Sequence, residues 1–291
     1  MTDIPRDQVR RPTYLEAIQD ISTRLTAAGI DSARLDAEVL LRHTAGISRS
    51  DLFLRYPDPL PPDVELVLEM LVTSRLAGRP VAYLVGEREF MGMPFRVGTG
   101  VLVPRPETEI LVEWALATLK PGATVVDVGT GSGAIGVSLA ALGNSLTVVA
   151  TDVSPIALGM AEENADRLLE GDRREHISFV AGSLLEPVSG PIDLVMANLP
   201  YLTPEQVAGN PDLAAEPRLA LDGGADGLDL IRALVKDLPR VLSPKGGVGL
   251  EIDPDQQLAV EDLLRSAFPN RQVTTLPDLA GFARHVVMPP A

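Results

Sequence analysis

The chain contains no cysteine among its 291 residues. This absence excludes disulfide bonds, thiolate ligands for a metal and a cysteine nucleophile. Only three histidines are present, and His43, His176 and His285 lack the spacing of a metal site. No apolar run approaches the ~20 residues that a membrane span requires. The first residues also lack the apolar core of a secretory signal peptide, so we expect a cytoplasmic protein that does not bind membranes.

Basic residues are scarce relative to acidic ones, with 25 Lys and Arg against 40 Asp and Glu and a net charge of −15. Residues 1–97 carry 12 basic and 14 acidic side chains, whereas residues 98–291 carry 13 and 26. Nucleic acids are bound chiefly through Lys and Arg, so the larger part is a poor candidate for direct nucleic-acid binding. The acidic surface favours solubility and suits a basic protein partner.

The first part of the chain has the pattern of a small helical bundle. Apolar residues recur at helical spacing after Thr13, Ser32, Ser48 and the pair Pro61-Pro62, which are residue types that begin helices. Residues 90–97 then predict a β-hairpin around a Gly/Pro turn. We expect a helical domain over residues 1–78, a hairpin linker over 79–103 and a larger domain over 104–291. The helical domain shows no reaction centre, which leaves docking of a partner as its expected use.

The larger domain alternates between strands and helices. Helices are predicted over residues 107–118, 134–142, 154–169, 227–241 and 254–267. Strands are predicted over residues 124–127, 146–151, 177–180, 192–197, 247–252, 272–276 and 283–288. This order implies an α/β fold with a doubly wound, Rossmann-like sheet of seven strands, in which ligands bind at the carboxyl ends of the strands.

A glycine-rich loop follows the first predicted strand and opens a helix. Glycines in this place let the backbone approach a ligand closely, and Asp152 ends the next strand, where an acidic side chain can accept hydrogen bonds from a ribose. A helix cap is the structural alternative for this carboxylate. The residues expected to contact a nucleoside cofactor are Gly129, Thr130, Gly131, Ser132, Gly133, Asp152, Ser183 and Asn198.

The identity of the cofactor depends on an acid that precedes the loop. Gly131, Gly133 and Gly136 match the pattern GxGxxG, so the glycines alone leave a dinucleotide open. Asp127 would sit badly beside a pyrophosphate but well near the cationic methionine end of S-adenosylmethionine. The sequence therefore favours S-adenosyl-L-methionine.

Asn198-Leu199-Pro200-Tyr201 ends a predicted buried strand. Pro200 restrains Leu199 to an extended conformation, so the Leu199 carbonyl and the Asn198 side-chain oxygen can act as two acceptors beside one aromatic ring. Such a site suits a planar NH2 group, either an amide or an exocyclic amine. A strand followed by a proline turn is the structural alternative.

Several motifs together resemble the HemK/PrmC family of release-factor glutamine methyltransferases, from Tyr14 to Val287. The specific motifs are residues 103–109 (Val-Pro-Arg-Pro-Glu-Thr-Glu), the loop 127–133, residues 197–201, residues 216–221 (Glu-Pro-Arg-Leu-Ala-Leu) and residues 278–281 (Asp-Leu-Ala-Gly). The resemblance implies a class I methyltransferase that methylates N5 of the glutamine in the Gly-Gly-Gln loop of class-I peptide chain release factors. It assigns catalysis to Asn198, Leu199, Pro200 and Tyr201, and a monomer is expected.

The sequence departs from the pattern of this family at three places. Leu199 stands where the family usually has a proline, and Ser183 where an acidic residue is frequent. Phe282 and Ala283 follow Gly281 where an Arg-Asp pair is more usual, with Arg284 retained. Three other functions stay open. They are methylation of a glutamine on a ribosomal protein, adenine N6-methylation of rRNA by enzymes that also use Asn-Leu-Pro-Tyr, and cofactor binding without catalysis.

Overall fold

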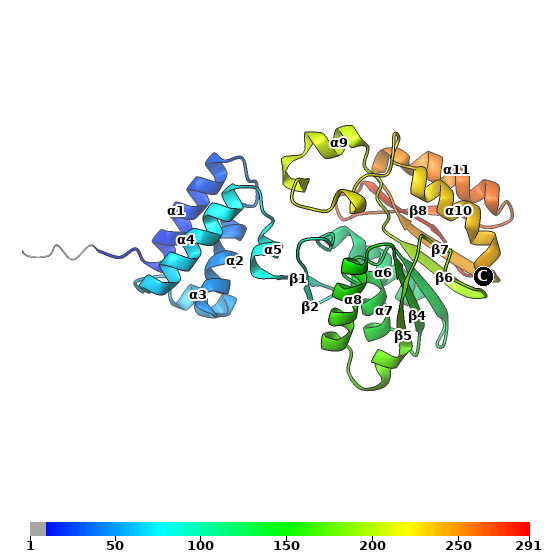
Figure 1. The fold of residues 1–291 in the computed structure, drawn as a ribbon, viewed down its shortest axis with the longest axis horizontal. Helices are drawn as coiled ribbons and strands as arrows, with labels where there is room; N and C mark the ends of the chain where they lie inside the picture. The colour runs from blue at the N-terminus through cyan, green and yellow to red at the C-terminus, as the bar shows by residue number, and fades with distance from the viewer. Residues whose placement is uncertain (1–9) are drawn as a thin grey trace, which may run out of the picture. The chain divides into compact units, whose positions relative to one another are not determined.

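The computed structural model describes residues 10–291, and the described chain divides into two compact units that meet between Val85 and Gly86 (Figure 1). The first unit is helical. Its helices are α1 (Tyr14–Ala27), α2 (Ala33–Ala45), α3 (Arg49–Leu54), α4 (Pro62–Leu76) and α5 (Val81–Val85). The first four follow the predicted starts, whereas the single turn of α5 was not predicted.

Local sequence explains why the helices of the first unit begin where they do. Thr13 accepts a hydrogen bond from the Glu16 amide while the Glu16 carboxylate accepts one from the Thr13 amide, which is a capping box. Apolar side chains of α1, α2 and α4 pack into a core of their own. A buried ion pair of 2.8 Å between Arg75 and Asp36 lies inside this bundle. The unit therefore has the internal core that an independent domain requires.

The second unit is built on a seven-stranded sheet with the order β5-β4-β3-β6-β7-β9-β8. Strands β3 to β7 are parallel, and β9 runs antiparallel to both β7 and β8. The strands are β3 (Thr124–Val128), β4 (Thr147–Asp152), β5 (Ile177–Ala181), β6 (Ile192–Ala197), β7 (Leu242–Glu251), β8 (Thr274–Pro277) and β9 (Ala283–Met288). The predicted seven-stranded α/β fold is confirmed.

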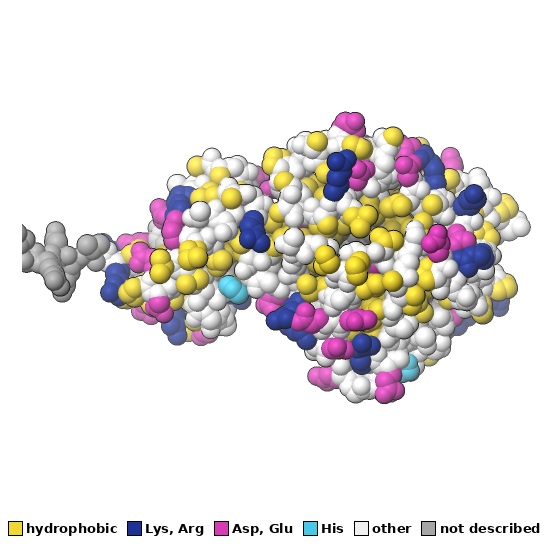
Figure 2. Space-filling model, viewed as in Figure 1, with side chains coloured by type: hydrophobic (Ala, Val, Ile, Leu, Met, Phe, Trp, Pro, Cys, Tyr) yellow, Lys and Arg dark blue, Asp and Glu magenta, His cyan; other side chains and the backbone are white. Residues whose placement is uncertain are grey.

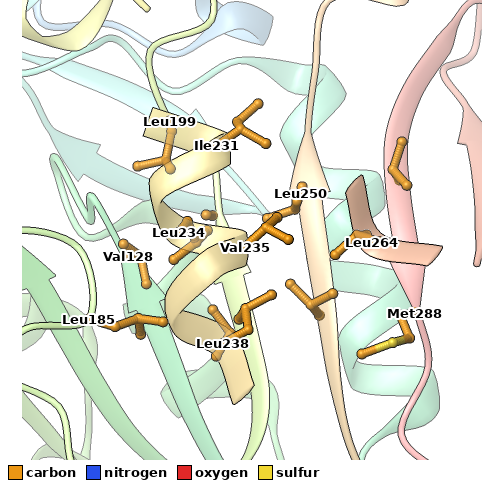
Figure 3. Close-up of a cluster of buried hydrophobic side chains, with 14 of the residues drawn as sticks. Val128, Leu185, Leu199, Ile231, Leu234, Val235, Leu238, Leu250, Leu264 and Met288 are labelled. Atoms are coloured by element: carbon orange, nitrogen blue, oxygen red, sulfur yellow. The ribbon is translucent and has the colours of Figure 1, made fainter. Parts of the chain in front are cut away.

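Helices cover both faces of the sheet (Figure 1). They are α6 (Pro106–Thr118), α7 (Ala134–Leu142), α8 (Pro155–Leu168), α10 (Asp229–Val241) and α11 (Gln257–Ala267). The short α9 (Pro204–Gly209) lies in the segment between β6 and α10 and has no buried residue. Alternate residues of β6 point to opposite sides: Leu194 and Met196 pack with α6 and α7, whereas Val195 packs with α10 and α11. Figure 3 shows the second of these clusters. Burial on both faces explains why the strands read as continuous apolar runs rather than alternating ones.

A two-stranded hairpin, β1 (Glu87–Phe90) and β2 (Met93–Arg96), belongs to the second unit. Asn164 of α8 is fully buried and clamps it: its Oδ1 accepts the Arg96 amide at 2.7 Å, and its Nδ2 donates to the Arg96 carbonyl at 2.9 Å. The same Nδ2 also donates to the Ser132 carbonyl at 2.8 Å. One amide thus links the hairpin to the glycine-rich loop.

No helix of residues 10–291 is long and apolar enough to cross a membrane.

Candidate active site

The glycine-rich loop connects the carboxyl end of β3 to the start of α7. Gly129, Gly131 and Gly133 all have positive φ. Gly133 caps α7, and a Cβ there would lie 2.9 Å from a Val137 methyl group and 3.1 Å from Ala161, so both its conformation and its surroundings require glycine. The loop therefore turns tightly, and its Gly129, Thr130, Gly131 and Gly133 amides all donate hydrogen bonds within the protein.

Asp152, at the end of β4, is tied to this loop. Its Oδ2 accepts the Gly131 amide at 3.0 Å, and its Oδ1 accepts the Ser154 amide at 2.8 Å. A carboxylate has about four lone-pair positions, so each oxygen keeps an acceptor site after these bonds. Asp152 also lines the cavity described below.

Asp127 lies beneath the loop rather than in the cavity, in contrast to its expected place beside the methionine end of a cofactor. It is fully buried, and its Oδ2 accepts hydrogen bonds from the Thr130 hydroxyl at 2.6 Å and the Gly136 amide at 2.9 Å. Burial raises the pKa of Asp127 to about 6, although these two bonds oppose the shift. Its carboxylate holds the loop to the start of α7, and the sequence expectation for its position was wrong.

A cavity of about 470 Å³ opens above the loop. This volume falls within the usual range for small-molecule sites. The predicted residues that line it are Gly129, Thr130, Gly131, Ser132, Asp152, Ser183, Asn198, Leu199 and Pro200. Gly133 and Tyr201 do not line it. Most of the predicted residues are therefore brought to one space by the carboxyl ends of β3, β4, β5 and β6.

Exposed apolar side chains surround this cavity. Val153 and Ile156, at the start of α8, and Leu219 are each more than half exposed and line it. Figure 2 shows hydrophobic side chains gathered across the middle of the second unit. Apolar walls with a few polar groups are typical of sites that enclose an aromatic base.

A smaller cavity of about 100 Å³ adjoins the first. Leu102, Arg105, Asn198, Leu199 and Ala220 line both cavities, so the two spaces share a wall. Tyr201 lines only the smaller one, together with leucines that come from the segment between β6 and α10. Asn198 and Leu199 consequently lie at the junction of a large and a small compartment.

Asn198 and Tyr201 are joined through buried partners on other elements. The Asn198 Nδ2 donates to the Thr108 hydroxyl at 3.1 Å, and Thr108 donates to Glu251 at 2.6 Å. The Tyr201 hydroxyl donates to the other oxygen of Glu251 at 3.3 Å. Burial, and then the nearby charge of Glu251, raise the pKa of Tyr201 well above its usual value. Tyr201 is therefore a neutral ring over the whole physiological range.

The backbone of Tyr201 is held by residues that the sequence did not single out as site residues. Gln256 is buried and donates from Nε2 to the Tyr201 carbonyl at 2.8 Å and to the Asp226 carbonyl at 3.3 Å. Gly227, with φ of +73°, packs so closely that a Cβ would lie 2.1 Å from the Tyr201 oxygen. Residues from two downstream positions, Gly227 and Gln256, thus hold the end of the Asn-Leu-Pro-Tyr motif in place.

An ion pair joins two of the motifs found in the sequence, residues 103–109 and residues 216–221. Arg105, from the Pro-Arg-Pro segment, forms a short salt bridge with Glu216, from the Glu-Pro-Arg segment. The same carboxylate accepts the Val103 amide at 3.0 Å. The Glu216 side chain is only 2% exposed, whereas that of Arg105 is 34% exposed and reaches both cavities. The two motifs therefore occur together because their side chains pair with each other at the wall of the site.

The departures from the family pattern lie in different places. Leu199 is buried and Ser183 lines the large cavity. Phe282 lies on the surface, 57% exposed, in a tight turn whose amides donate to Asp278. Asp278 has a lowered pKa because these backbone bonds and Arg284 stabilise its charge against burial. Nothing in the structure explains the substitution by Phe282.

Solved structures show which fold this chain has. A methyltransferase from Pyrococcus furiosus matches 68% of this chain and 89% of its own with a TM-score of 0.51 at 18% identity. The catalytic domain of hMettl16, solved in complex with the MAT2A 3'UTR hairpin 1, matches 77% of this chain and 80% of its own with a TM-score of 0.56 at 15% identity. Fold and glycine loop together are those of the class I methyltransferases, whose methyl donor is S-adenosylmethionine.

Comparison of sequences identifies the family. Residues 16–86 match the PrmC N-terminal domain, and residues 91–200 match the Ribosomal protein L11 methyltransferase (PrmA) family. The Release factor glutamine methyltransferase of Moorella thermoacetica is 41% identical over 92% of this chain and 95% of its own. That of Cereibacter sphaeroides is 43% identical over 93% and 96%, and that of Bacillus subtilis 36% over 94% and 96%. The chain belongs to the release factor glutamine methyltransferase family, which confirms the resemblance.

Proposed function

We propose that this protein transfers a methyl group from S-adenosylmethionine to N5 of the glutamine in the Gly-Gly-Gln loop of a class-I peptide chain release factor. The observation that carries the proposal is the position of Asn198 and Leu199 in the wall shared by a large and a small cavity. In a transferase the methyl donor and the acceptor must come together, and residues that line both cavities lie where the two would meet. The names of the relatives supply the substrate.

The residues of the large cavity fit the methyl donor. The positive-φ glycine loop leaves room for close approach, and Asp152 keeps free acceptor sites for ribose hydroxyls. Ser183 offers a hydroxyl at the end of β5, where the adenine is expected, and Val153 and Ile156 offer apolar contact. When bound, S-adenosylmethionine supplies a methyl group activated by a sulfonium. The assignment to Gly129, Asp152 and their neighbours is part of the proposal.

The smaller cavity fits a glutamine side chain. Leucines contact its methylenes, and the Asn198 Oδ1 and the Leu199 carbonyl accept one N–H each from its terminal amide. These two bonds would fix the nitrogen in line with the methyl group and stabilise the positive charge that develops on it. Pro200 restrains Leu199, and Tyr201 packs against the amide plane. The methylated nitrogen then loses its proton to water, so a strong general base is not required.

The experiment is incubation of the purified full-length protein with isotopically labelled S-adenosylmethionine and a purified class-I release factor. Mass spectrometry should locate one added methyl on the glutamine of the Gly-Gly-Gln peptide. A release factor with alanine in place of that glutamine is the matched control and should remain unlabelled. Label on a ribosomal protein or on adenine of rRNA, with the release factor unmodified, would contradict the proposed substrate.

The helical unit is proposed to dock the release factor, with the enzyme acting as a cytoplasmic monomer and without direct contact to nucleic acid. Exposed apolar side chains support this use, because Leu66 and Met70 lie one turn apart on α4 and are each about two-thirds exposed. Leu66→Asp with Met70→Asp should slow methylation of the intact release factor more than that of a short Gly-Gly-Gln peptide. Equal effects on both substrates would argue against docking through this face.

A further inference from the structure

A buried chain of hydrogen bonds lies behind Asn198 and has no place in the mechanism above. It runs from the Asn198 Nδ2 to the Thr108 Oγ1 at 3.1 Å, and from Thr108 to the Glu251 Oε2 at 2.6 Å. Thr108 is on α6 and Glu251 ends β7, so the chain connects three separate elements. Thr108 is 3% exposed and Glu251 is 2% exposed. Both side chains are thus largely withdrawn from bulk water, although Thr108 also lines the large cavity.

The direction of each bond follows from the number of protons available. A threonine hydroxyl has one proton and two lone pairs. The carboxylate of Glu251 accepts that proton, so only the lone pairs of Thr108 remain for Asn198. Because the Thr108 oxygen can only accept from Asn198, the asparagine must present its NH2 group to it. The opposite rotamer would set the Asn198 Oδ1 against an oxygen whose proton is already used.

No other neighbouring group of residues 10–291 replaces Thr108 as the donor to the Glu251 Oε2. The Tyr201 hydroxyl donates to its second oxygen, at 3.3 Å. His285 lies opposite on β9, fully buried, with Nε2 3.6 Å from Oε2, beyond hydrogen-bond distance. The Glu251 Oε2 is thus left to Thr108. Among residues 10–291, the Asn198 Oδ1 has no hydrogen-bond partner, and Asn198 lines both cavities.

We propose that Thr108, oriented by Glu251, is a positioning residue for methyl transfer that fixes the Asn198 amide with its oxygen, rather than its NH2 group, toward the substrate. The inference rests on the proposed function, since it concerns the acceptor of a substrate N–H. Asparagine oxygen and nitrogen are nearly equal in size, so packing alone does not select the rotamer. Without Thr108, an NH2 group facing the substrate amide would repel the N–H that the oxygen should accept.

The test compares Thr108→Val, which removes the hydroxyl and keeps the shape, with Thr108→Ser, which restores it. We expect Thr108→Val to lower kcat for the release factor by up to about 100-fold, as for a misplaced reacting group. Its dissociation constant for S-adenosylmethionine, measured by calorimetry, should stay within a few-fold of the wild-type value. Thr108→Ser should recover most of the kcat. Thr118→Val is the matched control, because Thr118 lies on the same helix and its hydroxyl, among residues 10–291, bonds only to the Trp114 carbonyl.

A second comparison separates positioning from a general structural role. In the Asn198→Ala background no amide remains to be oriented, so Thr108→Val should cause little further loss in single-turnover rate. Full additivity of the two changes would overturn the proposal, as would normal kcat in Thr108→Val or failure of Thr108→Ser to recover it. If Thr108→Val does not fold, Thr108→Ala replaces it in the same comparisons. A wild-type protein that leaves the release factor unmodified would refute the proposed function instead.

Discussion

Replacing Asp127 by asparagine should change how the stability of the second unit depends on pH. The Asp127 side chain is fully buried, and one of its oxygens, Oδ1, has no hydrogen-bond partner. Burial raises its pKa from the usual 3.8 to about 6. The folded protein therefore binds a proton at Asp127 more tightly than the unfolded chain does, and asparagine removes this titration while keeping an oxygen that can accept from Thr130 and Gly136.

The sign and the size of the effect follow from this difference. Between pH 3.8 and pH 6 the unfolded chain has lost the Asp127 proton while the folded protein retains it, so stability falls as pH rises and levels off above about pH 6. One pKa unit corresponds to about 1.4 kcal/mol, so the full cost at neutral pH is about 3 kcal/mol. Between about pH 4 and pH 7, the wild type should lose about 2 kcal/mol relative to Asp127→Asn.

Trp114 provides the assay, because it is the single tryptophan of the chain and lies on α6 in the second unit. Urea unfolding followed by its fluorescence gives the free energy of unfolding of that unit at each pH. Asp262→Asn, at a position whose side chain is 79% exposed, controls for loss of a carboxylate. Wild-type and Asp127→Asn profiles that stay parallel from pH 4 to pH 7 would refute the argument from burial.

Three other substitutions and one control test the site. Asn198→Ala should cost about 2–4 kcal/mol of transition-state stabilisation, seen as lost turnover with S-adenosylmethionine affinity retained, and near-normal turnover would reject the paired acceptors. Asp152→Ala should weaken S-adenosylmethionine binding by about 1.5–3 kcal/mol, and an unchanged dissociation constant in calorimetry would leave it only a structural role. Gly227→Ala should lower the melting temperature and the activity, because its Cβ would collide with the backbone carbonyl oxygen of Tyr201. Gly159→Ala, on α8 with open space around it, is the control and should raise stability by about 0.5–1 kcal/mol. If Gly227→Ala were the more stable variant, the close packing of Gly227 against Tyr201 would not matter.

The main elements of the site could be predicted from the sequence because they depend on local patterns. A buried strand must end in a polar residue to present a group to a ligand, and Asn198-Leu199-Pro200-Tyr201 has that form. The glycines before α7 are needed for positive φ in the loop itself. The doubly wound class of the sheet followed from the alternation of strands and helices, since parallel strands require crossovers. The cap at Thr13 was also readable, because both of its bonds span three residues.

Partners far apart in the chain were decided only by tertiary structure. Thr108 and Glu251 are 143 residues apart, and Asn198 and Thr108 are 90 apart. The residues next to Asp127 in the sequence do not show whether its carboxylate faces a ligand or the start of α7. Packing of α7 against one face of the sheet decides this, by supplying the Gly136 amide. The sequence by itself determined which backbone and side-chain groups arrive at the carboxyl ends of the strands, because local geometry dictates that. Only the tertiary structure decided which of them face the cavity and which are bound from behind, because long-range side chains compete for each donor and acceptor.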